Sequence, residues 1–262
     1  MSGLTNNEVQ KLIHKTLDPI MKAEGFLRTG RTYYKEMDGL VFILTTAASS
    51  SYFCSVTGWP THAFSVYDGI WIDGICPGIL GRYPKKKNKN GIYIPEAFNC
   101  IHITQNGMGY SIKRIAERPY SDTAQTYGVT NKAEINRRDL WVMPDDAEAQ
   151  AAFLAELKQQ VIECFLCRYR EYTDISKLEH LILDGPRKLN TEKGFADDQP
   201  FSKDNLAGNF QNYLSYAVLF YQRYGPEEKY LFYLNRIEQW AGLHRRKIPA
   251  CYYCGYGNEF KL

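Results

Sequence analysis

Two pairs of cysteines have the spacing of metal-binding half sites. Cys251 and Cys254, in the stretch CYYCG, have two residues between them and are followed by Gly255, and Cys164 and Cys167 are spaced alike. Two thiolates so spaced can hold one Zn²⁺, and two such pairs can close a structural site. Cys251 and Cys254 are therefore candidate zinc ligands. The opposing interpretation is a set of reduced thiols and no cofactor, because Cys164 falls on an apolar helical stripe and the pairs are far apart in sequence.

A cysteine and a histidine suggest nucleophilic chemistry at one further place. Cys100 and His102 are two residues apart, so they share a face if this segment is a strand. A thiol next to an imidazole is the arrangement of a cysteine nucleophile, although a core thiol beside a hydrogen-bonded imidazole is much commoner. The usual signatures of serine hydrolases, zinc proteases, P-loop enzymes and dinucleotide-binding enzymes are missing from the sequence. The sequence therefore favours a protein without catalytic residues.

Two basic clusters are candidates for contact with nucleic-acid phosphates, and Tyr83 or Tyr93 would be available to stack on a base. The cationic residues are Arg82, Lys85, Lys86, Lys87 and Lys89 in one loop, and Arg245, Arg246 and Lys247 near the C-terminus. The alternative interpretation is a pair of solvated surface segments. The even charge balance of the chain favours this alternative, since the net charge is only +3.

The composition is that of a globular protein. Hydrophobic residues make up 44% of the 262 residues, aromatic residues 14%, and tyrosine alone occurs 20 times. The polar N-terminus lacks the apolar core of a secretion signal, and no apolar run is long enough for a membrane span. We therefore expect a cytoplasmic protein without membrane contact. The odd number of cysteines, seven, fits reduced thiols better than a disulfide framework.

The elements that would position these residues begin with a helix. It starts at Thr5 or Asn6, is kinked or restarted at Pro19, and stops at Gly25. Strands are expected over residues 31–37 and 40–47, with Asp38 and Gly39 as the turn of a hairpin. Further strands are predicted at 51–59, 91–95, 100–104 and 139–143.

The second half of the chain has helical periodicity. Asp145 and Glu148 resemble a capping box, and a stripe follows that contains Leu154, Leu157, Val161, Cys164 and Phe165. Another helix spans about 174–183, and the polar segment 184–204 is the predicted linker. Two helices then form a hairpin, with Gly225 and Pro226 at its turn, and the apolar stripe of the second helix contains Leu231, Leu234, Ile237 and Trp240. The fold class is therefore α+β: an antiparallel sheet with an N-terminal helix and C-terminal helices. The expected domains are an α+β body over residues 1–185 and the hairpin with its tail over residues 205–262.

The N-terminal part resembles a known bacterial family. Lys22, Gly25 and Phe26 form a K-x-x-GF motif at the end of the first helix, the aromatic pair Tyr33–Tyr34 lies in the next strand, and Trp141 precedes an acidic helix start. These features resemble the family called domain of unknown function 4304, over roughly residues 8–185. The resemblance implies a helix-plus-sheet fold in a bacterial cytoplasmic protein and assigns no catalytic residues. The terminal hairpin is similar to a single tetratricopeptide-like unit.

The functional prediction is a non-enzymatic protein-interaction module. Missing catalytic motifs, abundant tyrosine and a terminal helix pair all favour this function. One concrete version is a bacterial immunity protein that neutralises a toxin by binding it. The alternative is a nucleic-acid-binding protein that uses the two basic clusters.

Overall fold

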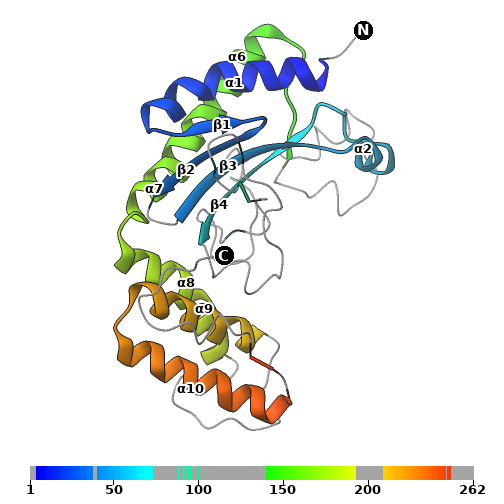
Figure 1. Ribbon diagram of the computed structural model, residues 1–262. Helices are drawn as coiled ribbons and strands as arrows, with labels where there is room; N and C mark the ends of the chain where they lie inside the picture. The colour runs from blue at the N-terminus through cyan, green and yellow to red at the C-terminus, as the bar shows by residue number, and fades with distance from the viewer. Residues whose placement is uncertain are drawn as a thin grey trace. The chain divides into compact units, whose positions relative to one another are not determined.

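A computed structural model describes most of the chain (Figure 1). The described residues are 4–37, 40–72, 88, 91, 94–95, 100, 140–192, 209–245 and 247–248; of residues 184–192, 209–213 and 244 only the backbone is described. The chain divides into two compact units. The first consists of residues 1–37, 41–70 and 102–169, and the second of residues 38–40, 71–101 and 170–262.

Helix α1 spans Asn6–Ala23 and is capped at both ends. Thr5 is the N-cap and forms a reciprocal capping box with Glu8, while Gly25 follows the helix with a positive φ of 79°. The start and the stop predicted from the sequence are therefore confirmed. The predicted restart at Pro19 is wrong, because α1 runs through this proline as one helix.

A five-stranded antiparallel sheet forms the centre of the first unit, with the strands in sequence order. They are β1 (Leu27–Thr29), β2 (Thr32–Met37), β3 (Leu40–Ala48), β4 (Phe64–Ile72) and β5 (Leu140–Trp141). Leu27 pairs with Tyr34 between β1 and β2, and Phe64 pairs with Trp141 between β4 and β5. The strands expected at 31–37, 40–47 and 139–143 are thus confirmed. The sequence interpretation missed β4, and the strands expected at 91–95 and 100–104 lie largely outside the described residues.

The strand predicted at residues 51–59 is instead a helix, α2, which spans Ser51–Thr57. Ser50 caps its N-terminus by accepting a hydrogen bond from the backbone N–H of Phe53 at 3.0 Å. Gly58 ends it in the left-handed conformation, with φ of 86°. Aromatic and β-branched residues made this segment look extended, but the two caps determine the outcome locally.

A long helical segment follows β5. It consists of α6 (Ala147–Gln160), a π-helical turn (Val161–Leu166) and α7 (Cys167–Glu171). Asp146 is the N-cap of α6, since its carboxylate accepts from the Ala149 N–H at 2.8 Å. The capping box predicted for Asp145 and Glu148 is therefore wrong: the N-cap is the next residue, Asp146, and the residue three positions after it is Ala149, whose side chain cannot complete a box.

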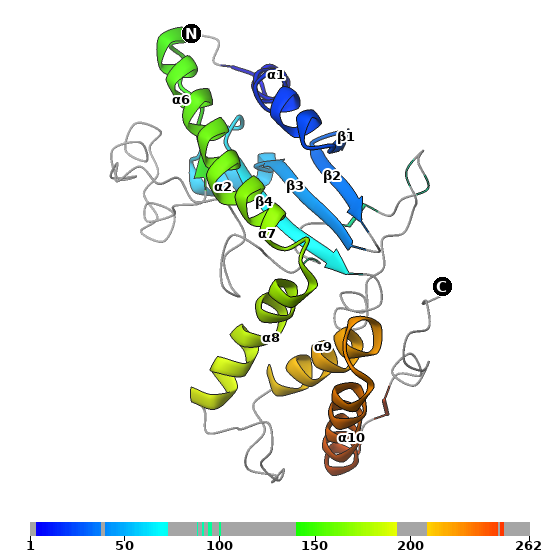
Figure 2. The ribbon, with the colours of Figure 1, turned by 90° about the vertical axis from the view of Figure 1, so that its left-hand side faces the viewer.

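Helix α1 and the α6–α7 segment pack on the same face of the sheet (Figure 2). On β3, the Phe42 ring contacts the Tyr169 ring of α7 edge-on, with 4.8 Å between the ring centres. The Thr46 hydroxyl donates a hydrogen bond to the Gln10 side chain of α1 at 3.1 Å. These two β3 residues are four apart and so point to one face. Near β5, Phe153 of α6 packs against Trp141 at 5.4 Å. The face is thus closed by an aromatic layer that both helical segments share.

One line of buried residues in this helical segment recurs every four residues. Its members are Phe153, Leu157, Val161, Phe165 and Tyr169, and Gln160 and Leu166 are buried beside it. In a regular α-helix, steps of four residues drift around the axis by about 40° each, so the last residues would leave the sheet. The π-turn is wound more loosely and recovers most of that drift. It therefore keeps Phe165 and Tyr169 against Phe26, at ring separations of 5.6 and 5.0 Å.

Within its described residues, the second unit contains three helices: α8 (Ile175–Glu192), α9 (Asn209–Tyr224) and α10 (Glu227–His244). The backbone of α8 continues to Glu192, so the expected linker begins later than residue 184; its remainder, 193–204, lies outside the described residues. Gly225 and Pro226 connect α9 to α10, as predicted, and these two helices pack along each other. The α+β fold class is therefore confirmed.

The hairpin buries two of the four α10 residues of the predicted stripe, Ile237 and Trp240. Tyr230, Tyr233, Ile237 and Trp240 are buried, whereas Leu231, which the apolar stripe was expected to bury, is exposed. A tyrosine ring makes the contact with α9 in place of Leu231, because Tyr233 stacks on Tyr221 with 5.3 Å between the ring centres. Within the described part of the chain, no helix has both the length and the apolar character needed to cross a membrane.

Candidate functional site

Few of the residues predicted to bind nucleic acid can be placed. Arg245 ends α10 in the left-handed conformation, with φ of 52°, and Arg245 and Lys247 are both exposed. Cations at this position also suit the negative end of the helix dipole. Arg82, Lys85, Lys86, Lys87, Lys89 and Arg246 lie outside the described residues. The nucleic-acid interpretation therefore stays a prediction.

The structure resolves only one of the two cysteine pairs. Cys164 is half-buried and Cys167 is exposed, whereas Cys251 and Cys254 lie outside the described residues. The π-turn explains why Cys164 is not central on the buried stripe, as a regular helix would place it. Among the described residues, no cluster of three or more potential metal ligands occurs. Cys100 is buried, and its proposed partner His102 is not described.

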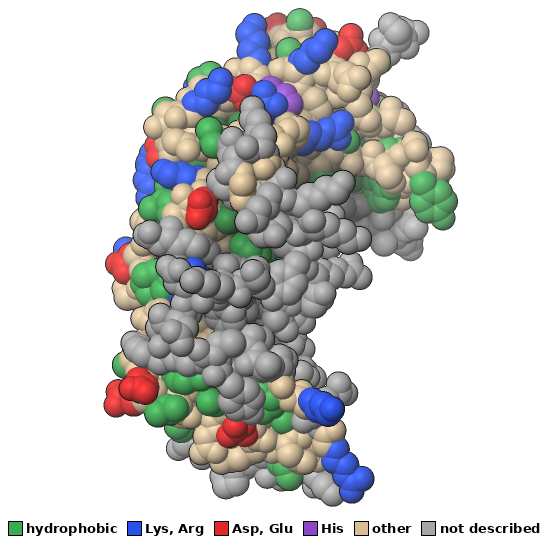
Figure 3. All heavy atoms as spheres, viewed as in Figure 1, with side chains coloured by type: hydrophobic (Ala, Val, Ile, Leu, Met, Phe, Trp, Pro, Cys, Tyr) green, Lys and Arg blue, Asp and Glu red, His purple; other side chains and the backbone are tan. Residues whose placement is uncertain are grey.

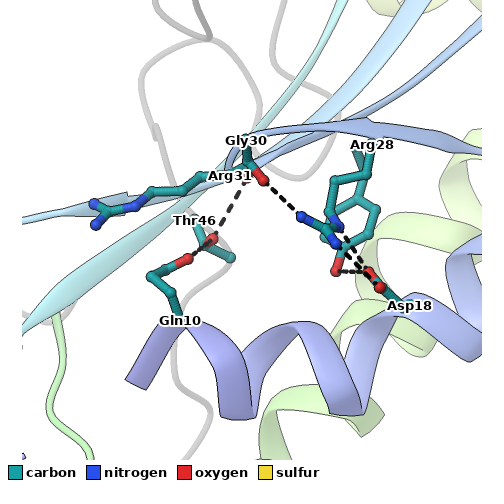
Figure 4. A network of polar contacts seen from close by, with 7 residues as sticks. Gln10, Asp18, Arg28, Gly30, Arg31 and Thr46 are labelled. Atoms are coloured by element: carbon teal, nitrogen blue, oxygen red, sulfur yellow. Dashed lines mark hydrogen bonds and ion pairs between the residues drawn. The ribbon is translucent and has the colours of Figure 1, made fainter. Parts of the chain in front are cut away.

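A polar network joins α1 to the first two strands (Figure 4). Arg28 donates from Nε and Nη2 to the two carboxylate oxygens of Asp18, at 2.9 and 3.2 Å. Tyr33 donates its hydroxyl to the same carboxylate at 2.8 Å. Arg28 also donates to the carbonyl of Gly30 at 3.0 Å, whereas the Arg31 guanidinium points away from this cluster.

The electrostatics of this network are those of a structural lock. Burial opposes the ionised form of Asp18, but the hydrogen bonds from Arg28 and Tyr33 and the guanidinium charge outweigh it, so its pKa is lowered. Burial and the Asp18 carboxylate raise the pKa of Tyr33 far above its usual range. A carboxylate that already accepts three hydrogen bonds is a poor general base. The network therefore fixes α1 on the sheet and supplies no reactive group.

Two histidines in the first unit are held in their neutral form. Burial, followed by the charges of Arg28 and Arg31, lowers the pKa of His14 despite the opposing charge of Asp18. Its Nε2 atom is buried and makes no hydrogen bond, and its ring meets Tyr33 edge-on at 6.4 Å. Burial also lowers the pKa of His62, against the charge of Asp145. Both residues therefore resist protonation in the folded state.

A buried carboxylate lies on the helix-facing side of β4. Asp68 is fully buried and is four residues from Phe64, so both point towards the helical layer. Burial is the main cause that raises the pKa of Cys164, and the charges of Glu163 and Asp68 raise it further. A thiol in such surroundings stays protonated at neutral pH. The π-turn thus carries a thiol that is unsuited to act as a nucleophile.

Helix α2 presents apolar side chains to solvent from a rigid base. Tyr52 and Val56, one helical turn apart, are 77% and 66% exposed. The base is a buried cluster of Trp59, Ala63, Leu140 and Val142, against which Phe53 of α2 packs. Hydrophobic side chains are visible at the surface over α2 in Figure 3. The segment from Gly39 to Tyr67 contains no Asp, Glu, Lys or Arg, so α2 and the chain on either side of it contribute no charged side chain to this surface.

A shallow groove of about 310 Å³ lies on the helical hairpin of the second unit, lined by Tyr221, Glu228, Lys229, Phe232 and Tyr233. Glu179 of α8 holds two of these lining residues in position, since its carboxylate accepts hydrogen bonds from the Tyr221 hydroxyl at 2.6 Å and from the Lys229 ammonium at 3.2 Å. The Lys229 ammonium also lies 5.0 Å from the centre of the Tyr221 ring. The groove therefore has an ordered aromatic wall with charges at its edge.

The polar groups at this groove are paired and not poised for catalysis. Burial opposes ionisation of Glu179, but its hydrogen bonds with Tyr221 and Lys229 and the ammonium charge outweigh it and lower its pKa. The sequence interpretation missed these residues. One signal was available in the run Tyr230–Tyr233, where four consecutive large side chains cannot all face the core of one helix.

Comparison of the chain with models of known protein families, with curated proteins and with solved structures finds no match. The resemblance to domain of unknown function 4304 therefore stays a prediction.

Proposed function

We propose that the protein is a non-enzymatic protein-interaction module, and in its most specific version a bacterial, cytoplasmic immunity protein that neutralises a toxin by binding it. The observation that carries the proposal is the outer face of α2. This helix is capped at both ends, is anchored through Phe53, and presents Tyr52 and Val56 from a segment that contains no charged residue.

Such a surface has the chemistry of the centre of a protein interface. Interface centres are depleted in charge and enriched in tyrosine, which brings a large contact area at a low cost in side-chain entropy. The caps and the anchored base mean that little ordering is needed when a partner binds. The neighbouring Ser51 and Ser55, both exposed, add small hydrogen-bonding groups to the same helix.

The test pairs the protein with the product of the gene adjacent to its own. Isothermal titration calorimetry should detect a complex, and cells that carry the adjacent gene should survive only when this protein is co-expressed. The double variant Tyr52→Ala with Val56→Ala should weaken binding by at least about tenfold, as hot-spot side chains do.

Leu27→Ala is the matched control, because Leu27 is also an exposed apolar residue of the first unit. This variant should bind as the wild type does. The proposal is abandoned if the protein neither binds the neighbouring gene product nor protects cells. Binding that is indifferent to both α2 substitutions would remove α2 as the contact surface.

Nucleic-acid binding is a second candidate, favoured by the outward position of Arg245 and Lys247. Its measurement is the affinity for a DNA duplex at several salt concentrations. Affinity that falls steeply with salt, and that is lost on charge reversal of Lys85, Lys86 and Lys87, would support it. Absent or salt-independent binding would eliminate it.

A further inference from the structure

A second surface, far from α2 in sequence, lies on the outer face of α10. Three large apolar residues of this helix are exposed: Leu231 at 51%, Phe232 at 44% and Leu243 at 39%. Phe232 and Leu243 are eleven residues apart, which is about three turns, so they lie on one line along the helix. Between them the exposed residues are Asn235, Glu238, Gln239 and Gly242.

The two ends of α10 carry opposite charges. Glu227 and Glu228 are exposed in the first turn, and Arg245 and Lys247 are exposed just beyond the last turn. Lys229 lies near the acidic end, but it forms an ion pair with Glu179 at 3.2 Å. It therefore neutralises Glu227 and Glu228 less than an unpaired lysine would. Each end of α10 is thus complementary to the opposite end of another α10.

From this pattern we propose that α10 is a self-association surface on which a second copy of the chain docks as an antiparallel helix pair. In such a pair, centred between residues 237 and 238, Phe232 of one copy lies opposite Leu243 of the other. At the side of the pair, Leu231 lies about 3 Å along the axis from the level of the other copy's Gly242, which has no side chain and nothing within 4 Å of the position a Cβ would take. The acidic ends meet the basic ends, and the helix dipoles run in opposite directions.

The contact is isologous, so each favourable pairing occurs twice. A helix of 18 residues is about 27 Å long. One helix pair of this length makes a small interface, and small interfaces form weak, reversible complexes. The dimer should therefore be measured over protein concentrations from about 1 to about 500 μM.

Sedimentation velocity of the full chain at low salt tests the proposal. The expected result is a reversible monomer–dimer equilibrium. Phe232→Ala combined with Leu243→Ala should raise the dimer dissociation constant by at least about tenfold. Leu27→Ala, an exposed apolar residue of the other unit, should leave it unchanged, and circular dichroism should show that each variant stays folded.

A charge-swap experiment separates the contact from general effects on folding. One variant carries Glu227→Lys and Glu228→Lys, and another carries Arg245→Glu and Lys247→Glu. Each alone should be monomeric, because like charges meet at both ends of the pair. An equimolar mixture should dimerise, because opposite charges then meet at both ends.

A monomer at every concentration would overturn the proposal, as would a dimer that ignores the apolar substitutions or a mixture that fails to associate. These outcomes are independent of the proposed toxin-binding function, which depends on α2 and is measured with a different partner.

Discussion

The Asp18 network makes a quantitative prediction about how α1 is held on the sheet. Asp18→Ala removes the acceptor of the buried Tyr33 hydroxyl, and a buried donor left without a partner costs about 1–3 kcal/mol. It also breaks the pair with Arg28, whose side chain is 32% exposed, and a pair so exposed contributes about 0–1 kcal/mol. Together these losses should lower the free energy of unfolding by about 2–3 kcal/mol.

A double-mutant cycle with Tyr33→Phe isolates the hydrogen bond. Tyr33→Phe alone should cost about 1 kcal/mol, because Asp18 keeps its bonds to Arg28. In the Asp18→Ala background the same change should cost almost nothing, since the stranded hydroxyl is removed. The coupling free energy should therefore be about 1 kcal/mol.

Urea unfolding followed by tryptophan fluorescence and circular dichroism supplies the four free energies of the cycle. Additive effects, with a coupling below about 0.3 kcal/mol, would refute the assignment of this network as a lock. The cycle also has a pH signature. The pKa of Asp18 is lowered in the folded state, so its stabilisation is present above the unfolded value of about 3.9 and is lost as the pH falls through the folded value.

Three further outcomes follow. Because the folded state lowers the pKa of His14 and His62, thermal stability should fall as the pH drops below about 6.5. In thermal melts between pH 7.5 and 5.5, the variant His14→Phe should show a smaller fall in melting temperature with pH than the wild type. An unchanged fall would contradict the lowered pKa of His14. Peptide mapping after brief alkylation should find Cys167 modified at least about tenfold faster than half-buried Cys164, and equal rates would argue against the π-turn. Gly58→Ala should destabilise by about 1–2 kcal/mol because its φ is 86°, and stabilisation in a thermal melt would contradict that backbone conformation.

Local signals in the sequence predict the ends of α1 and the turn of the helical hairpin. Thr5 is a good N-cap for the start of α1, and Gly225 with Pro226 is a typical turn between two helices. Ser50 and Gly58 are equally good cap residues for α2, but the run of aromatic and β-branched residues between them favours a strand. The strand prediction failed because two caps can fold seven residues whose propensities point elsewhere.

Side-chain position within a helix was harder to predict than the helix itself. The buried face of α10 depends on the side chains of α9 that it contacts, and Tyr233 is buried because it stacks on Tyr221 of α9. Leu231 is apolar and in phase with the predicted stripe, yet it is displaced to the surface. Surfaces such as the outer faces of α2 and α10 could not be predicted from periodicity, because periodicity does not say which of several large side chains the tertiary contacts will accept.

The π-turn at Val161–Leu166 has a consequence for the lengths of chain that this fold can accept. Such a turn is equivalent to one extra residue accommodated within a helix. Deleting one exposed residue, Glu163, would restore ordinary winding and would keep the segment helical. The deletion would leave Phe165 and Tyr169 on the face that meets Phe26 and Phe42, because it removes the residue that the turn accommodates. A one-residue deletion within the regular helix α6 would instead turn the residues on its two sides by about 100° relative to each other. A single-residue gap should therefore be accepted at the π-turn and rejected in α6, so that selection on the number of residues should be weaker at the turn than in the regular helix.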